Sequence, residues 1–217
     1  MENLDAIKHP GFVFDPSTTN VVGPIVGITM IVQPRKPLAT VERFHGSEVY
    51  AIYYAGAFPT YSAISKREHL ILVGKAVHAG TRKGGGTEGD TTRKPLYSRL
   101  SEHAESIRSA ENLDIVDFHC RFLVVDDIWI PLGESLLIAR FSPVWNAIID
   151  GFGNHNPGSG RYKGMRPRWD VLHPGRAWAA KCVDRAESPA DIARDVSTYL
   201  RNAPYPASTR FIGIDQN

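Results

Sequence analysis

Cysteine is scarce in this chain, with only Cys120 and Cys182 among its 217 residues. Two thiols are too few for a disulfide scaffold or a cysteine-rich zinc site, and such scarcity is typical of proteins in a reducing cytoplasm. The N-terminus also lacks the positive start and apolar stretch of a signal peptide. We therefore expect a cytoplasmic protein with free thiols.

Long apolar runs are missing as well. The longest run, residues 21–32, is interrupted by Gly23, Pro24 and Gly27. It falls well short of the ~20 apolar residues that a membrane helix needs. We expect no membrane contact and interpret the run as buried strand material, with residues 27–32 forming the strand.

Neither sign of charge dominates, since 25 basic residues face 23 acidic ones and the formal net charge is +2. So small an excess excludes no class of partner, but the charges are unevenly distributed. Residues 161–185 contain seven basic side chains and only two acidic ones, Asp170 and Asp184. This segment is therefore a candidate surface for binding an anionic ligand.

The composition is otherwise that of a globular protein, with 42% hydrophobic and 22% charged residues. The length suits one compact domain that carries long insertions. We expect an N-terminal extension at residues 1–45, a core at 46–147, and a ligand-recognition loop with a C-terminal helix at 148–217.

The pattern along the chain predicts an α+β fold, with a small mixed α/β core in which a central antiparallel sheet is flanked by helices. Strands are expected at residues 48–55, 69–74 and 117–125, where β-branched and aromatic residues concentrate. Helices are expected at 95–110, from about Pro131 to Pro143, and at 189–201, where Ser188 and Asp191 form a capping pair. The glycine-rich segments 80–94 and 151–175 are expected to be mostly loop.

Several side chains suited to phosphodiester cleavage are distributed over these elements. Tyr50 belongs to the strand Val49-Tyr50-Ala51-Ile52-Tyr53, and Gly74 and Lys75 belong to Leu70-Ile71-Leu72-Val73-Gly74-Lys75-Ala76. Arg99 and His103 project from neighbouring turns on one face of the first predicted helix. Glu134 lies in the opening turn of the next helix, and Asn146 follows it by twelve residues.

In this order and spacing, the residues resemble the GIY-YIG nuclease superfamily over about residues 47–147. The stretches Asp150-Gly151-Phe152-Gly153-Asn154-His155 and Trp169-Asp170-Val171-Leu172-His173-Pro174-Gly175-Arg176 resemble its type II restriction endonuclease branch, which cuts G·C-rich palindromes such as CCGCGG. The resemblance implies hydrolysis of double-stranded DNA.

The resemblance also implies that Glu134 binds one divalent cation, Mg²⁺ with Mn²⁺ as a substitute, and that Tyr50 is the general base or relays a proton to one. Because a phenol has a pKa near ~10, Tyr50 needs a partner, and the His103 imidazole is expected to titrate near neutral pH and accept its proton. Considered without the motif, each residue has a structural alternative. Glu134 would then be a favourable partner of the helix dipole, Tyr50 an ordinary strand aromatic, and His103 an ordinary surface histidine.

Arg99 is the candidate for stabilising the pentavalent phosphate, because a guanidinium offers paired donors, and a salt bridge with Glu102 or Glu105 is its alternative. Lys75 is expected to place a point charge near the scissile phosphate, or else to be an exposed lysine at a strand end. Asn146 is expected to orient a ligand, a water molecule or backbone, with a turn after Pro143 as the alternative.

Leu72 stands where the second motif of the family begins with tyrosine. The hydroxyl that helps to position the water or Tyr50 must then be dispensable or come from another tyrosine, for which the candidates are Tyr53, Tyr54, Tyr61 and Tyr97. If neither holds, the chain binds DNA and cuts it poorly.

A G·C-rich target requires basic side chains, because guanine presents two acceptors in the major groove. The predicted DNA-binding residues are Arg82, Lys83, Arg161, Lys163, Arg166, Arg168 and Arg176, each of which has contact with phosphate alone as its alternative. Trp169 is expected to anchor the loop at 151–175. The loop at 80–94 lacks the Gly-Lys-Ser/Thr ending of a P-loop, so we do not interpret it as a nucleotide site.

A palindromic target predicts a homodimer with one active site for each strand, and a restriction enzyme requires a cognate DNA methyltransferase in the same cell. Two other readings compete with this one. The first is a DNA-binding protein that has lost turnover through Leu72. The second is a different nuclease chemistry centred on Asn154-His155-Asn156, which resembles histidine-and-asparagine metal motifs.

Overall fold

The computed structural model describes residues 22–42, 48–76, 95–125, 129–158, 160 and 162–202. Its centre is a four-stranded antiparallel sheet with the strand order β1-β4-β2-β3. The strands are β1 (Lys36–Pro37), β2 (Glu48–Tyr54), β3 (Leu70–Ala76) and β4 (Phe118–Val124). The predicted α+β class and its three main strands are confirmed.

The register of the sheet brings the two motif strands together. β2 lies between β3 and β4, and Tyr50 is opposite Gly74 on one side and Phe122 on the other. The β2–β3 pairing has an irregularity between Ile52 and Tyr53. β3 is the edge strand of the sheet, so its outer side is open to contact from the helices.

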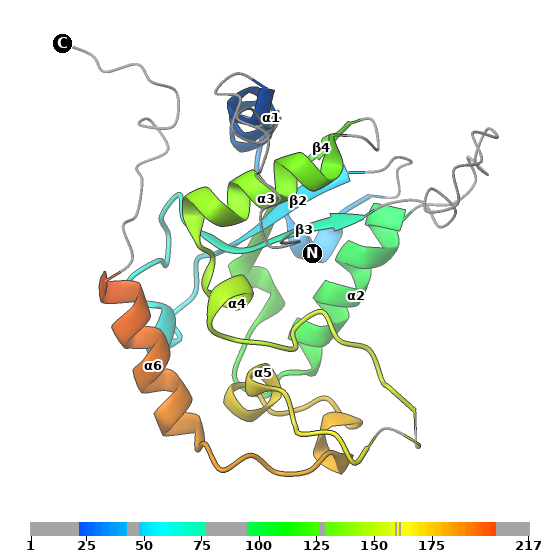
Figure 1. Ribbon diagram of the computed structural model, residues 1–217, viewed down its shortest axis with the longest axis vertical. Coiled ribbons are helices and arrows are strands. Elements are labelled where there is room, and N and C mark those ends of the chain that lie inside the picture. The colour runs from blue at the N-terminus through cyan, green and yellow to red at the C-terminus, as the bar shows by residue number, and fades with distance from the viewer. Residues whose placement is uncertain are drawn as a thin grey trace, which may run out of the picture.

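Helices lie on both faces of this sheet (Figure 1). They are α1 (Val22–Ile31), α2 (Pro95–Ser109), α3 (Ile130–Phe141), α4 (Val144–Ala147), α5 (Arg168–Leu172) and α6 (Pro189–Asn202). Short 3-10 turns are η1 (Leu38–Thr40), η2 (Pro59–Tyr61), η4 (Ile115–Asp117) and η6 (Ala179–Lys181). The segment 151–175 is mostly loop, as predicted, and contains the short helix α5.

Two hydrophobic clusters fill the space on the two faces. One lies beneath α1 and α3 and contains Met30, Val49, Tyr53 and Leu137. The other lies beneath the remaining long helices and contains Tyr50, Leu72, Trp145 and Trp169, among others. Because side chains alternate along β2, Tyr50 and Tyr53 reach opposite clusters.

The strand expected at residues 27–32 was wrong, because this segment forms the end of α1. Its residues are apolar on every side, so their pattern carries no helical period that distinguishes a helix from a buried strand. Pro24 lies in the first turn, where the missing N–H costs no hydrogen bond. Met30 and Ile31 bury against the cluster beneath α3, which stabilises the helix.

The predicted helix ends are largely confirmed, with one correction. α3 begins at Ile130, so Glu134 is its fifth residue and lies in the second turn instead of the opening one. The helix stops at Phe141, because Ser142 takes a left-handed conformation with φ of 43° and Pro143 follows. At the start of α6, Ser188 and Asp191 exchange backbone and side-chain hydrogen bonds as a capping pair.

No helix in the described parts of the chain is both long and apolar enough to cross a membrane.

Candidate active site

Gly74 leaves the space that the Tyr50 side chain occupies. The two residues are directly opposite each other in β3 and β2. A Cβ atom at position 74 would lie 2.4 Å from the Tyr50 hydroxyl oxygen and 2.5 Å from its Cζ. Since these distances are far below van der Waals contact, any larger residue would displace the phenol. The two strand motifs therefore form one unit.

Tyr50 and His103 form a buried hydrogen-bonded pair between β2 and α2. The Tyr50 hydroxyl lies 2.7 Å from Nε2 of His103, and both side chains are 2% exposed. A neutral imidazole with its proton on Nδ1 accepts at Nε2 the hydrogen bond that the phenol donates. The helix and the sheet thus place an acid and a base in direct contact.

Burial sets the protonation of this pair. It lowers the pKa of His103 to about 3, and the neighbouring Arg99, His155 and Arg176 act in the same direction. Burial raises the pKa of Tyr50 to about 12, although the Arg99 guanidinium opposes that shift. The expected titration of His103 near neutral pH is therefore wrong for the protein without its ligand. The proton stays on Tyr50, and His103 is neutral.

Arg99 lies one turn before His103 on α2 and faces the same site. Its Nη1 is 3.3 Å from a Glu102 carboxylate oxygen and 2.9 Å from Nε2 of His155. It also lies near enough to Tyr50 to lower the pKa of the phenol. The salt bridge with Glu102 is thus present, and the same guanidinium also reaches the Tyr50–His103 pair.

Glu134 and Lys75 form an ion pair at the edge of the sheet. Nζ of Lys75 lies 2.7 Å from Oε2 of Glu134, and the carboxylate side chain is 19% exposed. The Glu134 charge also acts on the Tyr50 phenol, whose pKa it raises. The carboxylate therefore lies near enough to the phenol to act on its charge.

The Glu134 carboxylate fits a single hard cation that arrives with a ligand. Among the residues that the structure describes, no three His, Cys, Asp or Glu side chains gather as a ligand cluster. Mg²⁺ commonly binds through one or two carboxylates, with water and substrate phosphate completing its shell. Glu134 satisfies that minimum, and Lys75 shows that the carboxylate attracts positive charge.

The Asn146 amide pairs with the backbone of β3. Its Oδ1 accepts a hydrogen bond from the Val73 N–H, and its Nδ2 donates one to the Val73 carbonyl, both at 2.8 Å. The side chain thus continues the ladder of the edge strand in place of another strand. Of the roles considered for Asn146, the structure places it where it orients backbone directly beside Gly74.

Leu72 lies on the same sheet face as Tyr50, opposite Ile52, and is 8% exposed. The hydroxyls of the replacement candidates Tyr53, Tyr54 and Tyr61 are hydrogen-bonded to groups outside the site. The fourth candidate, Tyr97, is half-buried on α2, two residues before Arg99.

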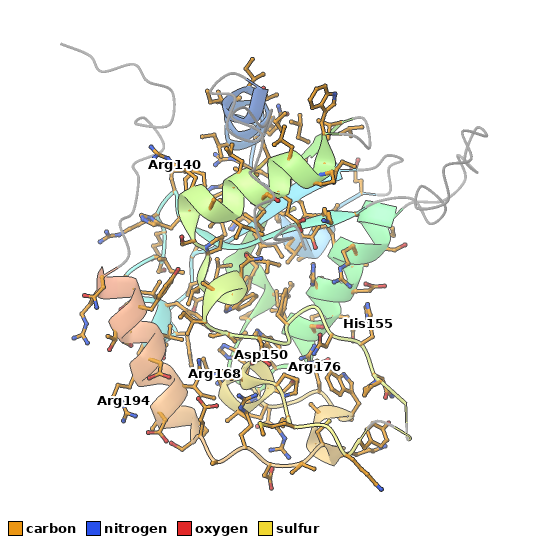
Figure 2. The ribbon with its side chains drawn as sticks, in the orientation of Figure 1. Arg140, Asp150, His155, Arg168, Arg176 and Arg194 are labelled. Carbon is orange, nitrogen blue, oxygen red and sulfur yellow. The ribbon has the colours of Figure 1, made fainter. Side chains whose placement is uncertain are left out.

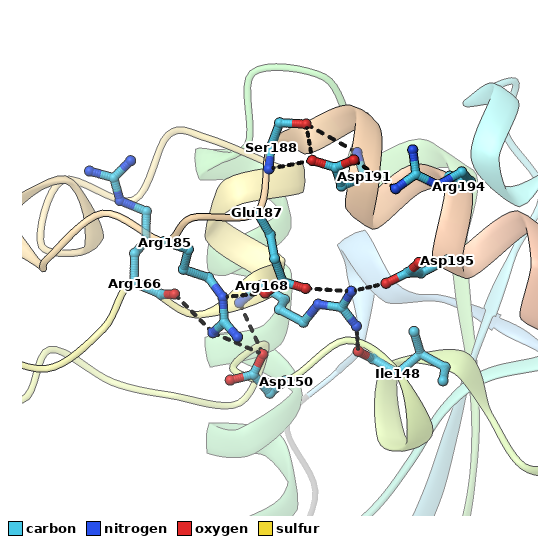
Figure 3. A network of polar contacts seen from close by, with 10 residues as sticks. All are labelled: Ile148, Asp150, Arg166, Arg168, Arg185, Glu187, Ser188, Asp191, Arg194 and Asp195. Carbon is cyan, nitrogen blue, oxygen red and sulfur yellow. Dashed lines mark hydrogen bonds and ion pairs between the residues drawn. The ribbon is translucent and has the colours of Figure 1, made fainter.

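Two predicted DNA readers, Arg166 and Arg168, make contacts within the protein instead. Arg168 pairs with Glu187 and Asp195 and donates a hydrogen bond to the Ile148 carbonyl, which ties α5 to α6 (Figure 3). Arg166 donates from Nε to the Ala179 carbonyl and pairs through Nη2 with Asp184. Both side chains make contacts within the protein, so we propose structural support in place of the DNA contact that the sequence predicted for them.

Arg176 also requires correction, because it is 6% exposed and its donors are all in use. It binds both oxygens of Asp170 and three backbone carbonyls. Its guanidinium also stacks between Trp169, the predicted loop anchor, and Trp178. No donor remains for a nucleobase.

Of the other predicted readers, Lys163 is exposed, whereas Arg82, Lys83 and Arg161 lie outside the described residues. The expected loop at 80–94 also lies entirely outside them.

The sequence did not reveal the role of Phe152. Its ring stacks on His103 with a centroid distance of 4.7 Å and an interplanar angle of 14°. His155, three residues later, lies beside α2 and contacts Arg99 (Figure 2). The Asn154-His155-Asn156 motif thus borders the Tyr50 site. In the sequence, the only sign that Phe152 matters is its position as a single aromatic residue between two glycines.

The comparisons agree with this geometry. The chain matches a family model described as the Eco29kI GIY-YIG domain, and the match covers residues 42–200. No curated protein matches the chain. The matched region spans well over half of the sequence and includes the motif residues from Tyr50 to Asn146. The chain therefore belongs to the Eco29kI family of GIY-YIG nucleases, the type II restriction endonuclease branch whose substrate is DNA.

Proposed function

We propose that the chain is a Mg²⁺-dependent endonuclease that cuts double-stranded DNA at a short G·C-rich palindrome such as CCGCGG. The observation that carries this proposal is the 2.7 Å contact between Tyr50 and His103, with the Arg99 guanidinium near enough to lower the pKa of the same phenol. A nuclease must deprotonate water and neutralise charge on phosphoryl oxygens. The Tyr50 hydroxyl and the Arg99 guanidinium meet these two needs within one site.

Tyr50 is the proton relay in this proposal. An attacking water transfers a proton to the Tyr50 oxygen while the Tyr50 proton passes to Nε2 of His103, which becomes an imidazolium. The water oxygen forms a bond to phosphorus, the bond from phosphorus to the leaving sugar oxygen breaks, and that oxygen takes up a proton from solvent water. A phosphate held by Arg99 brings negative charge that opposes the positive charges lowering the pKa of His103. Substrate binding thus prepares the base.

Glu134 is the residue that would hold Mg²⁺, which supplies charge neutralisation at the phosphoryl and leaving oxygens when bound. Lys75, which now pairs with Glu134 at 2.7 Å, is then available to contact a DNA phosphate. Mn²⁺ is expected to substitute, because carboxylate and water ligands also suit it.

The palindromic target favours a homodimer, because two-fold symmetry in the DNA matches two identical active sites. The single domain of residues 1–217 would act in the cytoplasm beside a cognate methyltransferase that protects the host sites. Lys163 is the described basic residue we retain as a DNA contact, together with Arg82, Lys83 and Arg161.

Leu72 favours a second candidate, a sequence-specific DNA-binding protein with impaired cleavage. The side chain is apolar and buried where the family motif has a hydroxyl. This candidate shares the scaffold and the DNA contacts but predicts no turnover.

Incubating the purified chain with plasmid and phage DNA, with Mg²⁺ or with EDTA, and sequencing the fragment ends tests the proposal. We expect discrete cuts at one palindrome with Mg²⁺ and none with EDTA. A specific complex without cuts would support the second candidate, and Leu72→Tyr would then be expected to restore cleavage. Cuts that persist in EDTA would contradict the metal assignment.

A further inference from the structure

Arg176 holds a loop in place through a complete set of hydrogen bonds. Its Nε and Nη2 donate to the two Asp170 carboxylate oxygens at 2.6 and 2.5 Å. Its Nη1 donates to the carbonyls of Phe152 and Asn154 at 3.0 and 3.1 Å, and its Nη2 donates to that of Gly151 at 2.9 Å. A guanidinium has five N–H groups, so none is left over.

The segment that Arg176 holds, residues 151–155, is named here the covering loop. Its carbonyl oxygens point to Arg176, and its side chains contact the active site. Phe152 is 2% exposed and stacks on His103. A Cβ added at Gly153 would lie 2.8 Å from Nη2 of Arg99, so backbone passes closely over that guanidinium. The covering loop therefore contacts both predicted catalytic residues of α2.

Phe152 is itself fixed from behind by a layer of aromatic rings. Trp145 lies 4.3 Å and Trp169 5.2 Å from it, measured between ring centroids. Trp169 in turn lies under the Arg176 guanidinium at 4.6 Å. Motion of the Phe152 ring toward or away from His103 thus requires this whole layer to move.

The position of His103 depends on these contacts. The groups that face its ring are Tyr50 from β2, Arg99 from α2, and Phe152, His155 and Arg176 from the chain beyond α4. Tyr50 binds one edge of the imidazole, whereas Phe152 covers its face. A displacement of about 1 Å at a catalytic group can reduce the rate by about 100-fold.

We propose that Arg176 and Phe152 are positioning residues of the nuclease site: Arg176 fixes the covering loop, and the loop's Phe152 ring holds His103 against Tyr50. This inference rests on the proposed function and extends it to residues that do not touch DNA. It replaces the base-reading role that the sequence predicted for Arg176.

Phe152→Leu and Arg176→Lys test the proposal, with Phe118→Leu as the matched control. Phe118 is also fully buried and contacts Trp145, and its ring belongs to the same cluster. Single-turnover cleavage at saturating DNA is measured below the unfolding temperature of each variant, with DNA affinity measured in parallel. We expect Phe152→Leu and Arg176→Lys to lower the rate about 10- to 100-fold with DNA Kd unchanged within about threefold. Phe118→Leu should keep the rate of the unmodified chain.

A second readout does not depend on cleavage. Diethyl pyrocarbonate modifies accessible histidines, and mass spectrometry resolves each site. His103 should react slowly in the unmodified chain and in Phe118→Leu, and about 10-fold faster in Phe152→Leu and Arg176→Lys. His155, whose side chain is 60% exposed, serves as the internal reference.

Unchanged rate and unchanged His103 protection in Phe152→Leu would overturn the proposal. Loss of DNA affinity in Arg176→Lys with an unchanged single-turnover rate would overturn it for Arg176 and return that residue to base reading. If the unmodified chain cuts no DNA, the proposed function fails, and histidine protection alone decides whether Arg176 and Phe152 hold His103.

Discussion

The Tyr50 hydroxyl and His103 Nε2 lie 2.7 Å apart, and both side chains are buried. This contact joins β2 to α2. Arg99 lies one turn before His103 on the same helix. Burial keeps the proton on the phenol and the imidazole neutral. In the proposed mechanism, a ligand that brings negative charge to Arg99 favours proton transfer to His103, because it opposes one of the causes of the low His103 pKa.

Gly74→Ala is expected to reduce cleavage by about 100-fold or more. The new methyl group would lie 2.4 Å from the Tyr50 hydroxyl, so the phenol must move away from His103. Single-turnover cleavage at saturating DNA measures the effect.

Gly56→Ala is the matched control, because its Cβ would lie 2.4 Å from the Tyr54 hydroxyl and 2.1 Å from Oδ2 of Asp117. Both variants overpack the protein, at a cost of about 1–3 kcal/mol in unfolding free energy. Equal cleavage rates for the two variants would remove the special role of Gly74.

Glu134→Gln is expected to keep DNA binding and to lower Mg²⁺-dependent cleavage on the order of 1,000-fold, because the carboxylate charge is lost. Glu68→Gln is its control, since Glu68 is also ion-paired, with Arg35 and Arg121, on the chain just before β3. Binding is measured by gel shift and cleavage by single turnover. Full cleavage by Glu134→Gln would refute the metal assignment.

Stability is expected to fall as the pH drops from 7.5 to 5.5. Burial lowers the pKa of His103 and of His173 to about 3, from 6.5. Between those values the unfolded chain binds protons that the folded chain does not, so the free energy of unfolding rises with pH. Each histidine contributes a fall of about 1.4 kcal/mol over this interval.

Urea unfolding at pH 7.5 and 5.5 measures this dependence, and His173→Gln should remove about half of it. His173 is a useful choice because its ring bonds Tyr61 and Asn112, away from the Tyr50–His103 contact. Equal unfolding free energies at the two pH values would show that these histidines are not held neutral by the fold.

Arg168→Ala and Lys163→Ala should have opposite effects. Arg168 links Ile148, Glu187 and Asp195, so its loss should lower the free energy of unfolding by about 1–3 kcal/mol with DNA affinity unchanged. Lys163 is exposed, so its loss should weaken DNA binding and reduce the salt slope by about 1 with stability unchanged. Thermal unfolding and salt-dependent DNA titrations distinguish the two effects, and the reverse pattern would contradict both assignments.

The order of elements and the motif residues were accessible from sequence, because their periodicity and spacing are local properties. Strands β2, β3 and β4 and helices α2, α3 and α6 were predicted close to their observed ranges. α1 was not, since a uniformly apolar segment has no period and its helix is stabilised by packing on distant residues.

The burial of charged and titrating groups was not accessible in the same way. Arg176 is an arginine in a basic segment, as expected of a DNA contact, but it is enclosed by Asp170 and two tryptophans. His103 has a low pKa because Phe152, far along the chain, covers it. Such effects depend on contacts between segments that the sequence order does not bring together.

Comparing Tyr50→Phe with Tyr53→Phe in single-turnover cleavage tests the central claim most directly. Both tyrosines are buried in β2, but Tyr53 faces the opposite cluster and its hydroxyl accepts a hydrogen bond from Arg121. Loss of a positioned proton relay predicts a rate about 100- to 10,000-fold lower for Tyr50→Phe, with DNA Kd unchanged and Tyr53→Phe near the unmodified rate. Cleavage by Tyr50→Phe at the unmodified rate would contradict the account.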